Sequence, residues 1–432
     1  MTVKSEAKVE VDLLVEPIGE LVTSRHRGGP ARGLAMVEIE RIKDGAIAIR
    51  DGEIVLSGKR DQVLSQIADR SACTVVAAGD RLVSPGLVDP HTHLVFGGDR
   101  ADEFMMRCQG KTYAEIAEAG GGIVASMRGT RGASLADLVG SGRRRLDRML
   151  AHGTTTCEVK TGYGLDRESE LRMLTAILDL DAEHPVDLVP TFLPAHAVPP
   201  GKSRSEYVED IVSDILPAAA QLLDQRGLAR HSIYVDVFCD RGYFTLADTE
   251  AIFEKSLSLG MRLKVHADEF ESLGATALAV EKGAASADHL LAISDRDIER
   301  LSGSETVAVL LPGTSFYLNL KEHAPARRLI DAGAAVAVGS DYNPGSCHIF
   351  SLPMIMGLSC LHLGLKVEEA LTAMTVNAAF AIGAGDRIGQ LSEGYQADIV
   401  IWDVGRLEEI PYNMGFNPVG AIIKKGRVVP AS

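Results

Sequence analysis

The sequence has 432 residues, of which 46% are apolar and 24% charged, and these fractions exclude wholesale disorder. Its 44 Lys and Arg against 59 Asp and Glu give a formal net charge of −15. That balance argues against nucleic acid or an anionic membrane as a partner, because both need clustered cations. It does not argue against a small anionic substrate, which a few local arginines can bind.

The cysteines and the first residues of the chain bear on location. Six scattered cysteines without a C-x-x-C pair predict free thiols in a reducing compartment. Residues 1–11 mix Lys and Glu and lack the apolar core of a signal peptide, so we expect a cytoplasmic protein. The stretch 342–365 has no Asp, Glu, Lys or Arg, yet it contains Pro, Asn and His. There we expect a buried turn followed by a packed helix rather than a membrane span.

From about residue 82 onward, apolar strand-like runs alternate with amphipathic helical patterns. The runs lie at 82–95, 154–160, 186–193, 233–239, 262–266, 286–290, 307–311 and 335–340, and the helical patterns at 135–150, 168–180, 207–223, 247–259, 273–282 and 295–301. Short strands alternating with helices imply a parallel sheet with right-handed crossovers. Eight such units predict an α/β fold with a (β/α)8 TIM-like barrel, although an open doubly wound sheet would satisfy the same count.

Both chain ends have a different pattern. Residues 11–81 contain short alternating strands with turn signals such as Asp51-Gly52, and residues 397–402 and 420–429 repeat that pattern. We therefore expect one small β-sandwich built from both termini. Its parts would be 1–81 and 389–432, with the barrel at 82–388.

Candidate catalytic groups stand at the ends of the strand-like runs, where barrel enzymes carry their chemistry. His91 and His93 follow the first run, and strand alternation places both rings on one face. His266, His289 and Asp341 end the fifth, sixth and eighth runs. An H-x-H pair alone is equally consistent with core histidines, but five such groups at strand ends are hard to explain by packing. Imidazoles with one carboxylate suit Zn²⁺ or Fe²⁺ and leave a position for water.

Two further residues bear on the number of ions and on proton transfer. Lys160 could be a carbamylated bridge between two metals, but it lies on the second run and the fourth run has no lysine. One ion is therefore the prediction. Glu269, three residues beyond His266, is placed to act as a proton shuttle for the same water. The alternative is a carboxylate on a solvent-facing loop.

An ordered set of motifs resembles the amidohydrolase superfamily, and within it the imidazolonepropionase family. The segments are 91–100 (HTHLVFGGDR), 120–123 (GGGI), 130–131 (TR), 160–165 (KTGYGL), 194–199 (PAHAVP), 238–239 (FC), 266–269 (HADE), 311–313 (LPG) and 340–346 (SDYNPGS). The set spans residues 85–346 in order, which makes it specific. One departure is Asp240, where much of the family has Glu.

The resemblance implies a metal-dependent hydrolase that opens the ring of 4-imidazolone-5-propanoate to N-formimidoyl-L-glutamate in histidine degradation, working as a homodimer. It implies one divalent ion, Zn²⁺ or Fe²⁺, bound by His91, His93, His266 and Asp341. Substrate contacts would come from Arg100, Tyr163, His196, Glu269, Asn343, Gly345 and Ser346. Glu269, His289 and Asp341 would be catalytic. Arg100 is the residue that could pair with the propanoate carboxylate.

Several alternatives stay open at this point. Arg100 could be a surface ion-pair partner of Asp99 or Glu103, and residues 343–346 could be a plain turn. A mononuclear aminohydrolase of the cytosine deaminase type shares the His-x-x-Glu segment. A catalytically silent scaffold on the same barrel would have lost metal ligands, and none is lost here.

Overall fold

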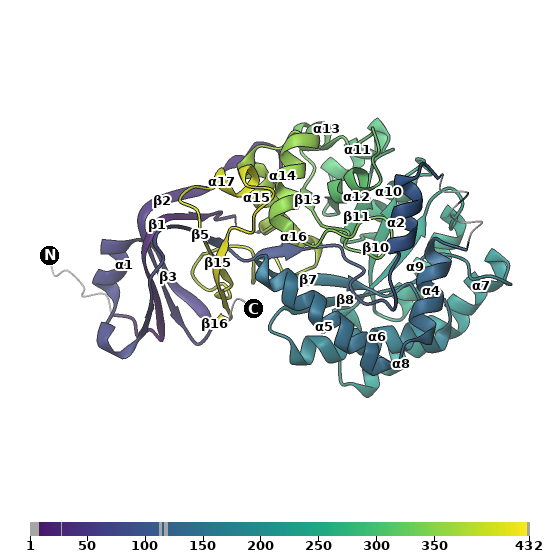
Figure 1. Cartoon of the computed structure of the whole chain (residues 1–432), viewed down its shortest axis with the longest axis horizontal. Helices are drawn as coiled ribbons and strands as arrows, with labels where there is room; N and C mark the ends of the chain where they lie inside the picture. The colour runs from purple at the N-terminus through teal and green to yellow at the C-terminus, as the bar shows by residue number, and fades with distance from the viewer. Residues whose placement is uncertain (1–7, 27, 112–114, 116–119, 430–432) are drawn as a thin grey trace.

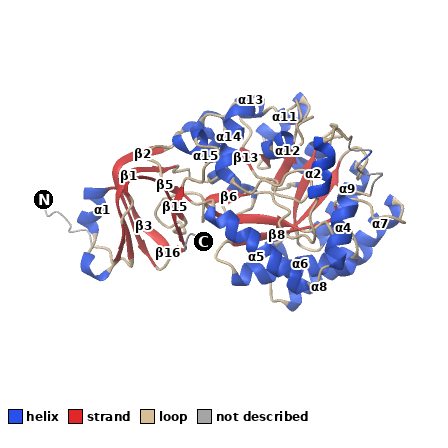
Figure 2. Ribbon diagram, viewed as in Figure 1, coloured by secondary structure: helices blue, strands red, loops and turns tan. Residues whose placement is uncertain are grey.

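The structure is a computed structural model that describes residues 8–26, 28–111, 115 and 120–429. It consists of a barrel surrounded by helices and a separate sheet that carries both chain ends (Figure 1). Figure 2 shows the strands of the barrel enclosed by helices, and the strands of the sheet grouped to one side.

Eight parallel strands form the barrel and follow one another in chain order. They are β6 (Leu87–Asp89), β7 (Thr154–Lys160), β8 (Asp187–Ala195), β9 (Tyr234–Cys239), β10 (Arg262–Ala267), β11 (Ser286–His289), β12 (Val307–Leu310) and β13 (Val336–Val338). The first and last strands meet just beyond their ends: Thr92 bridges Tyr342 in parallel, and the Asp341 amide donates to the His91 carbonyl at 3.0 Å. These contacts join the two edges, so the predicted closed barrel is confirmed.

Helices surround the barrel and confirm the helical predictions with one interruption. They are α2 (Ala101–Cys108), α4 (Ile123–Gly132), α5 (Leu135–Ala151), α6 (Arg167–Glu183), α7 (Arg204–Asp210), α8 (Leu216–Gln225), α9 (Leu246–Ser258), α10 (Ala275–Lys282), α11 (Asp295–Ser302), α12 (Pro312–Tyr317), α13 (Ala326–Asp331), α14 (Leu352–His362), α15 (Val367–Ala373) and α16 (Val376–Ala381). The predicted helix 207–223 contains a π-helical turn, Ile211–Ile215, between α7 and α8. Pro217 in the first turn of α8 explains it, since proline lacks the amide that would continue the ladder.

Both chain ends build one mixed sheet, as predicted. Its strands are β1 (Leu13–Thr23), β2 (Glu40–Arg50), β3 (Glu53–Lys59), β4 (Thr74–Val76), β5 (Gly79–Pro85), β14 (Ile399–Trp402), β15 (Val419–Lys424) and β16 (Arg427–Val429), with the short helices α1 (Arg60–Gln66) and α17 (Glu409–Tyr412) beside them. The strand order is β16-β15-β14-β5-β1-β2-β3, and β4 pairs with β1. An isolated bridge from Glu53 to Gln396 brings β3 back to the segment before β14, so the sheet curls around a shared apolar core.

The prediction of one strand over 82–95 is wrong. The chain leaves the terminal sheet at Pro85 and enters the barrel at Leu87, so the run is divided between β5 and β6. Gly86 sits at the crossing, where a Cβ would lie 2.2 Å from the Thr155 hydroxyl and would clash with it. The predicted boundary between residues 81 and 82 falls inside β5, and the three proposed parts of the chain stay a prediction.

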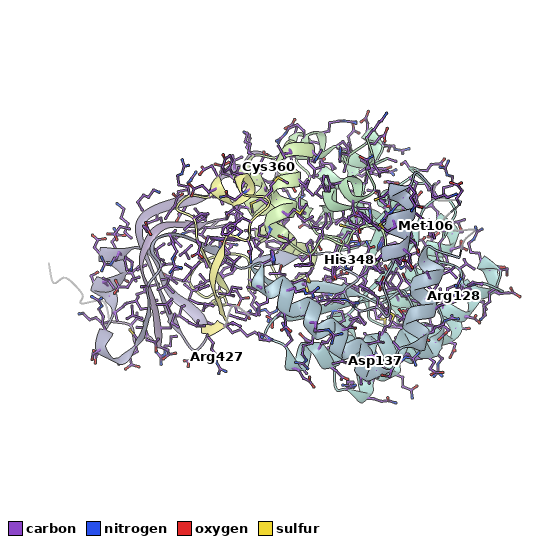
Figure 3. The ribbon with its side chains drawn as sticks, in the orientation of Figure 1. Met106, Arg128, Asp137, His348, Cys360 and Arg427 are labelled. Atoms are coloured by element: carbon purple, nitrogen blue, oxygen red, sulfur yellow. The ribbon has the colours of Figure 1, made fainter. Side chains whose placement is uncertain are left out.

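The terminal sheet contacts the amino ends of the barrel strands and leaves their carboxyl ends free. Lys424 of β15 donates to Asp187 at the start of β8, at 2.8 Å. Met106 of α2 and Arg128 of α4 lie far from this sheet, whereas Arg427 lies on its edge strand β16 (Figure 3).

The charge-free stretch 342–365 forms a largely buried turn followed by α14 (Leu352–His362), as expected. Within the described residues, no helix has both the length and the apolar character needed to cross a membrane.

Candidate metal and active site

Four of the predicted residues bring their polar atoms together at the carboxyl end of the barrel. His91 Nε2 lies 3.5 Å from Asp341 Oδ1, and His93 Nε2 lies 3.6 Å from the same oxygen. His266 Nε2 lies 3.4 Å from His93 Nε2. All four side chains are buried, with at most 2% of each residue exposed. The structure thus brings these four side chains together, and their role as metal ligands stays a prediction.

The spacing of these atoms fits a small divalent cation. A tetrahedral ion with bonds of about 2.0–2.1 Å places its ligand atoms roughly 3.4 Å apart, close to the three separations in the cluster. His91 Nε2 and Asp341 Oδ1 are both buried without a hydrogen-bond partner among the described residues. Such orphaned atoms are costly unless a ligand satisfies them. Burial also lowers the pKa of His91 and His93 well below the ordinary value, so both rings are neutral and offer lone pairs.

Carboxylates on two other barrel strands lie close to the Nδ1 atoms of two of these rings. Asp288 Oδ2 lies 2.6 Å from His91 Nδ1, and Asp236 Oδ2 lies 2.9 Å from His266 Nδ1. Because His91 Nδ1 faces Asp288, the proton of the neutral His91 ring resides on Nδ1, and its Nε2 is left free for the cation. The Thr314 hydroxyl donates to Asp341 Oδ2, which leaves Oδ1 facing the histidines.

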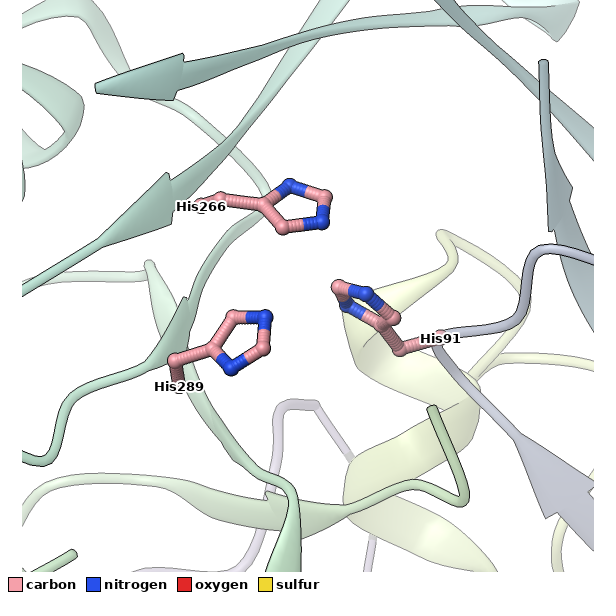
Figure 4. Close-up of side chains that lie close together, drawn as sticks. All are labelled: His91, His266 and His289. Atoms are coloured by element: carbon pink, nitrogen blue, oxygen red, sulfur yellow. The ribbon is translucent and has the colours of Figure 1, made fainter. Parts of the chain in front are cut away.

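His289 and His196 extend the cluster. The rings of His91, His266 and His289 point toward one another (Figure 4), and their centroids are 4.6–5.4 Å apart. His196 stacks on His93 with ring centroids 4.9 Å apart. Three overlapping groups of described residues could therefore hold an ion: His91 with His266 and His289, His93 with His196 and His266, and His91 with His93 and Asp341. The predicted ligands comprise the last group together with His266.

Glu269 lies beside the cluster, as the spacing from His266 predicted, and is not a solvent-facing loop residue. Its Oε2 atom is 3.7 Å from His289 Nδ1, and its side chain is 10% exposed. Burial raises the pKa of Glu269 well above its ordinary value, and the nearby Asp341 and Asp240 carboxylates raise it further. His289 has no hydrogen-bond partner for either ring nitrogen among the described residues. Both side chains are thus available to a ligand.

His196 and Tyr163 form an aromatic wall next to the cluster. The ring centroids of Tyr163 and His196 are 5.2 Å apart, and both residues are buried. His196 Nδ1 lies 3.0 Å from the Gly162 carbonyl, which can only accept, so this nitrogen carries the proton. Burial lowers the pKa of His196 to about 3. The neutral ring therefore presents Nε2 as a hydrogen-bond acceptor.

Arg100 stands at the start of α2 and is not a surface residue. Its Nη2 donates to Glu103 Oε2 at 2.6 Å, and both side chains are only 11% exposed. Its Nε–H is buried without an acceptor among the described residues. Gly345 packs directly against the guanidinium: a Cβ there would lie 1.8 Å from Arg100 Nη1. A side chain at residue 345 would therefore displace the Arg100 guanidinium.

Asn343 organises the turn that follows β13. Its Oδ1 accepts from the amides of Gly345 at 2.8 Å, Ser346 at 2.7 Å and Cys347 at 3.3 Å. Its Nδ2 donates to the Asp341 carbonyl and to the Ser346 hydroxyl. The side chain is fully engaged within the turn, so here it shapes the loop that carries Gly345 and Ser346.

Comparison with known proteins places the chain in a family. A model described as "Amidohydrolase family" matches residues 111–429. A protein of Symbiobacterium thermophilum named imidazolonepropionase is 49% identical over 421 residues, which cover 97% of each chain. A protein of the same name from Chloroflexus aggregans is 47% identical, covering 97% of this chain and 98% of the relative. The chain belongs to the imidazolonepropionase family of the amidohydrolases.

Solved structures share the fold of this imidazolonepropionase-family chain at low sequence identity. Escherichia coli guanine deaminase superposes with a TM-score of 0.72 and 15% identity, covering 96% of this chain and 98% of the neighbour. A zinc-containing adenosine deaminase from Xanthomonas campestris gives a TM-score of 0.66 and 19% identity, covering 98% and 93%. These likenesses concern the fold alone.

The sequence did not lead us to predict the buried charged residues that lie next to the site histidines on the barrel strands. Glu158, Asp236, Lys264 and Asp288 lie on barrel strands and are fully buried, but none of these four is among the predicted site residues. The available signal was a charged residue inside an otherwise apolar run. Charged side chains are almost never fully buried unless they are paired, so such a position predicts a partner on an adjacent strand.

Proposed function

We propose that this chain hydrolyses the ring amide of 4-imidazolone-5-propanoate and releases N-formimidoyl-L-glutamate. The observation that carries the proposal is the juxtaposition of a buried His3Asp cluster with Glu269 and His289, beside an arginine whose Nε–H has no acceptor among the described residues. Full-length relatives named imidazolonepropionase support the same substrate.

His91, His93, His266 and Asp341 would hold the one divalent cation, Zn²⁺ or Fe²⁺. When bound, such a cation lowers the pKa of a coordinated water and polarises a carbonyl group. The chain itself fixes these ligands. The Nδ1 atoms of His91 and His266, which point away from the cluster, each lie next to a carboxylate, and the Thr314 hydroxyl donates to Asp341.

Glu269 is the general base in this proposal. It accepts a proton from the water that attacks the ring carbonyl carbon, and the burial that raises its pKa strengthens it as a proton acceptor. His289, free at both nitrogens among the described residues, orients the water and the developing oxyanion. Asp341, whose pKa burial raises to about 6, passes the second proton of that water to the departing ring nitrogen as the C–N bond breaks, and Glu269 then releases the first proton to solvent.

Recognition of the substrate is divided between its ring and its carboxylate. His196 Nε2 accepts a hydrogen bond from a ring N–H, because its Nδ1 is committed to the Gly162 carbonyl. Tyr163 covers the ring. Arg100 pairs with the propanoate carboxylate, and the turn residues Gly345 and Ser346 line the same end. These local contacts let the anionic substrate bind although the protein has a net charge of −15.

The deciding experiment follows the loss of ultraviolet absorbance when purified protein meets enzymatically generated 4-imidazolone-5-propanoate. We expect turnover that depends on stoichiometric bound metal, with N-formimidoyl-L-glutamate as the product. Cytosine and guanine serve as control substrates. Ammonia release from either one, without imidazolone turnover, would contradict the proposal in favour of a deaminase. Light scattering of the same preparation tests the expected homodimer.

A further inference from the structure

Lys160, at the carboxyl end of β7, is a fully buried lysine among three carboxylates. Its Nζ lies 2.7 Å from Glu158 Oε1, 2.8 Å from Asp236 Oδ2 and 3.6 Å from Asp288 Oδ2. The three carboxylates come from β7, β9 and β11, so one ammonium group connects three barrel strands. Burial alone would lower the pKa of Lys160, but the three carboxylates raise it above its ordinary value.

Two of these carboxylates continue directly to the metal-binding rings. The Asp236 Oδ2 atom that contacts Lys160 also faces His266 Nδ1, and Asp236 Oδ1 accepts from the His266 amide at 3.1 Å. Asp288 Oδ2 likewise lies between Lys160 and His91 Nδ1. The same ammonium therefore sets the position of the oxygen behind each of two proposed ligands.

The third carboxylate, Glu158, contacts Thr92 of the H-x-H segment. Glu158 Oε2 accepts from the Thr92 amide at 3.2 Å, and the Thr92 hydroxyl donates to the Glu158 carbonyl at 2.6 Å. The Lys160 amide donates to the Thr92 carbonyl at 2.9 Å. Since Thr92 separates His91 from His93, this contact fixes the backbone between those two ligands.

We propose that Lys160 is the positioning residue of the metal centre: through Asp236, Asp288 and Glu158 it holds His266, His91 and the backbone between His91 and His93 in the geometry that binds the cation. Without the ammonium, three buried carboxylates would repel one another at short range, and the oxygens behind the rings would shift. Because Lys160 Nζ contacts three carboxylates, it is not available as a ligand that bridges two metal ions. The inference rests on the proposed metal centre.

Lys264 offers a matched control. It is equally buried on strand β10, but its Nζ donates to the Pro90 carbonyl at 3.1 Å and forms no ion pair within 4 Å in the described part of the chain. Lys160→Met and Lys264→Met therefore each remove a fully buried amino group, but only the first removes direct contacts with the three carboxylates.

The test measures the Zn²⁺ dissociation constant of each folded variant by competition with a chelator, and the visible spectrum of the Co²⁺-substituted protein. We expect Lys160→Met to weaken Zn²⁺ binding by about 10–100-fold and to alter the Co²⁺ spectrum. Lys264→Met should change the affinity less than threefold and preserve the spectrum. Wild-type affinity in folded Lys160→Met, or an equal loss in both variants, would overturn the inference.

A second variant covers the case in which Lys160→Met does not fold. Lys160→Met combined with Glu158→Gln removes one positive and one negative charge, which keeps the buried charge balanced. It should fold and still bind Zn²⁺ about 10-fold more weakly or worse, because Asp236 and Asp288 have lost their ammonium. Wild-type affinity in this double variant would overturn the inference. If the wild-type protein itself bound no divalent metal, the proposed function would fail instead, so the two failures are distinguishable.

Discussion

Replacement of Arg100 by alanine tests how an acidic protein binds an anionic substrate. The guanidinium is 11% exposed, so water screens a bound carboxylate only weakly. Each hydrogen bond to a charged group contributes about 1.5–3 kcal/mol, and two such bonds at the lower value give about 3 kcal/mol. We therefore expect kcat/KM for 4-imidazolone-5-propanoate to fall roughly 100-fold, mainly through KM, with metal content unchanged.

The assay compares this substrate with an imidazolone that lacks the propanoate group. Because the carboxylate is the group that Arg100 binds, the truncated substrate should react equally slowly with the wild type and with Arg100→Ala. Arg226→Ala is the control, since it removes a surface arginine that pairs with Asp179 at 2.8 Å. An equal loss on both substrates, or an unchanged KM for the natural one, would refute Arg100 as the carboxylate-binding residue.

Three other changes probe the site and its support. His266→Ala should remove bound metal and activity together, as measured by elemental analysis and turnover; full activity in metal-free protein would contradict the metal-dependent reaction. Glu269→Gln should lower kcat by about 10²–10⁴-fold while metal content stays constant, and a wild-type kcat would exclude Glu269 as the base. Glu170→Gln should remove a pH dependence of stability. Burial raises the pKa of Glu170 from 4.5 to about 7, so its contribution to the free energy of unfolding is full below pH 4.5 and is lost as the pH rises through 7. The loss amounts to about 3 kcal/mol at most, and urea unfolding of both proteins at pH 5 and pH 8 measures it; an identical pH dependence would contradict the assignment.

The sequence predicts the barrel well because its signal is local. Each apolar run after the first contains one barrel strand, and the residues at its carboxyl end must lie at one end of the barrel once the sheet is closed. His266, His289 and Asp341 were found in this way, although they are separated by up to 75 residues. The split of the first run at Gly86 could not be found, because the clash that requires glycine there comes from Thr155 on the next strand.

The buried carboxylates that lie next to the site histidines were not predicted, for a related reason. Asp236 and Asp288 each stand inside an apolar run, which predicts a buried partner, but nothing local to β9 or β11 identifies a histidine as that partner. The register of neighbouring strands determines which side chains face one another. It pairs His266 with Phe238 on β9 and with Asp288 on β11. Register follows from the assembled barrel and not from any single run.

The loops that carry the site residues are fixed by the same kind of distant partner. Asp240, at the end of β9, accepts from the amides of Glu269 at 2.8 Å and Phe270 at 2.9 Å, on the loop after β10. Glu170 of α6 accepts from Gly162, Gly164 and Leu165 around Tyr163 at 2.7–3.0 Å. Each buried oxygen gathers several amides of an irregular segment that cannot satisfy them itself. The departure from the family pattern at Asp240 therefore concerns the residue that holds the loop of the proposed base, because a longer side chain there would have to reach the same amides from a different angle.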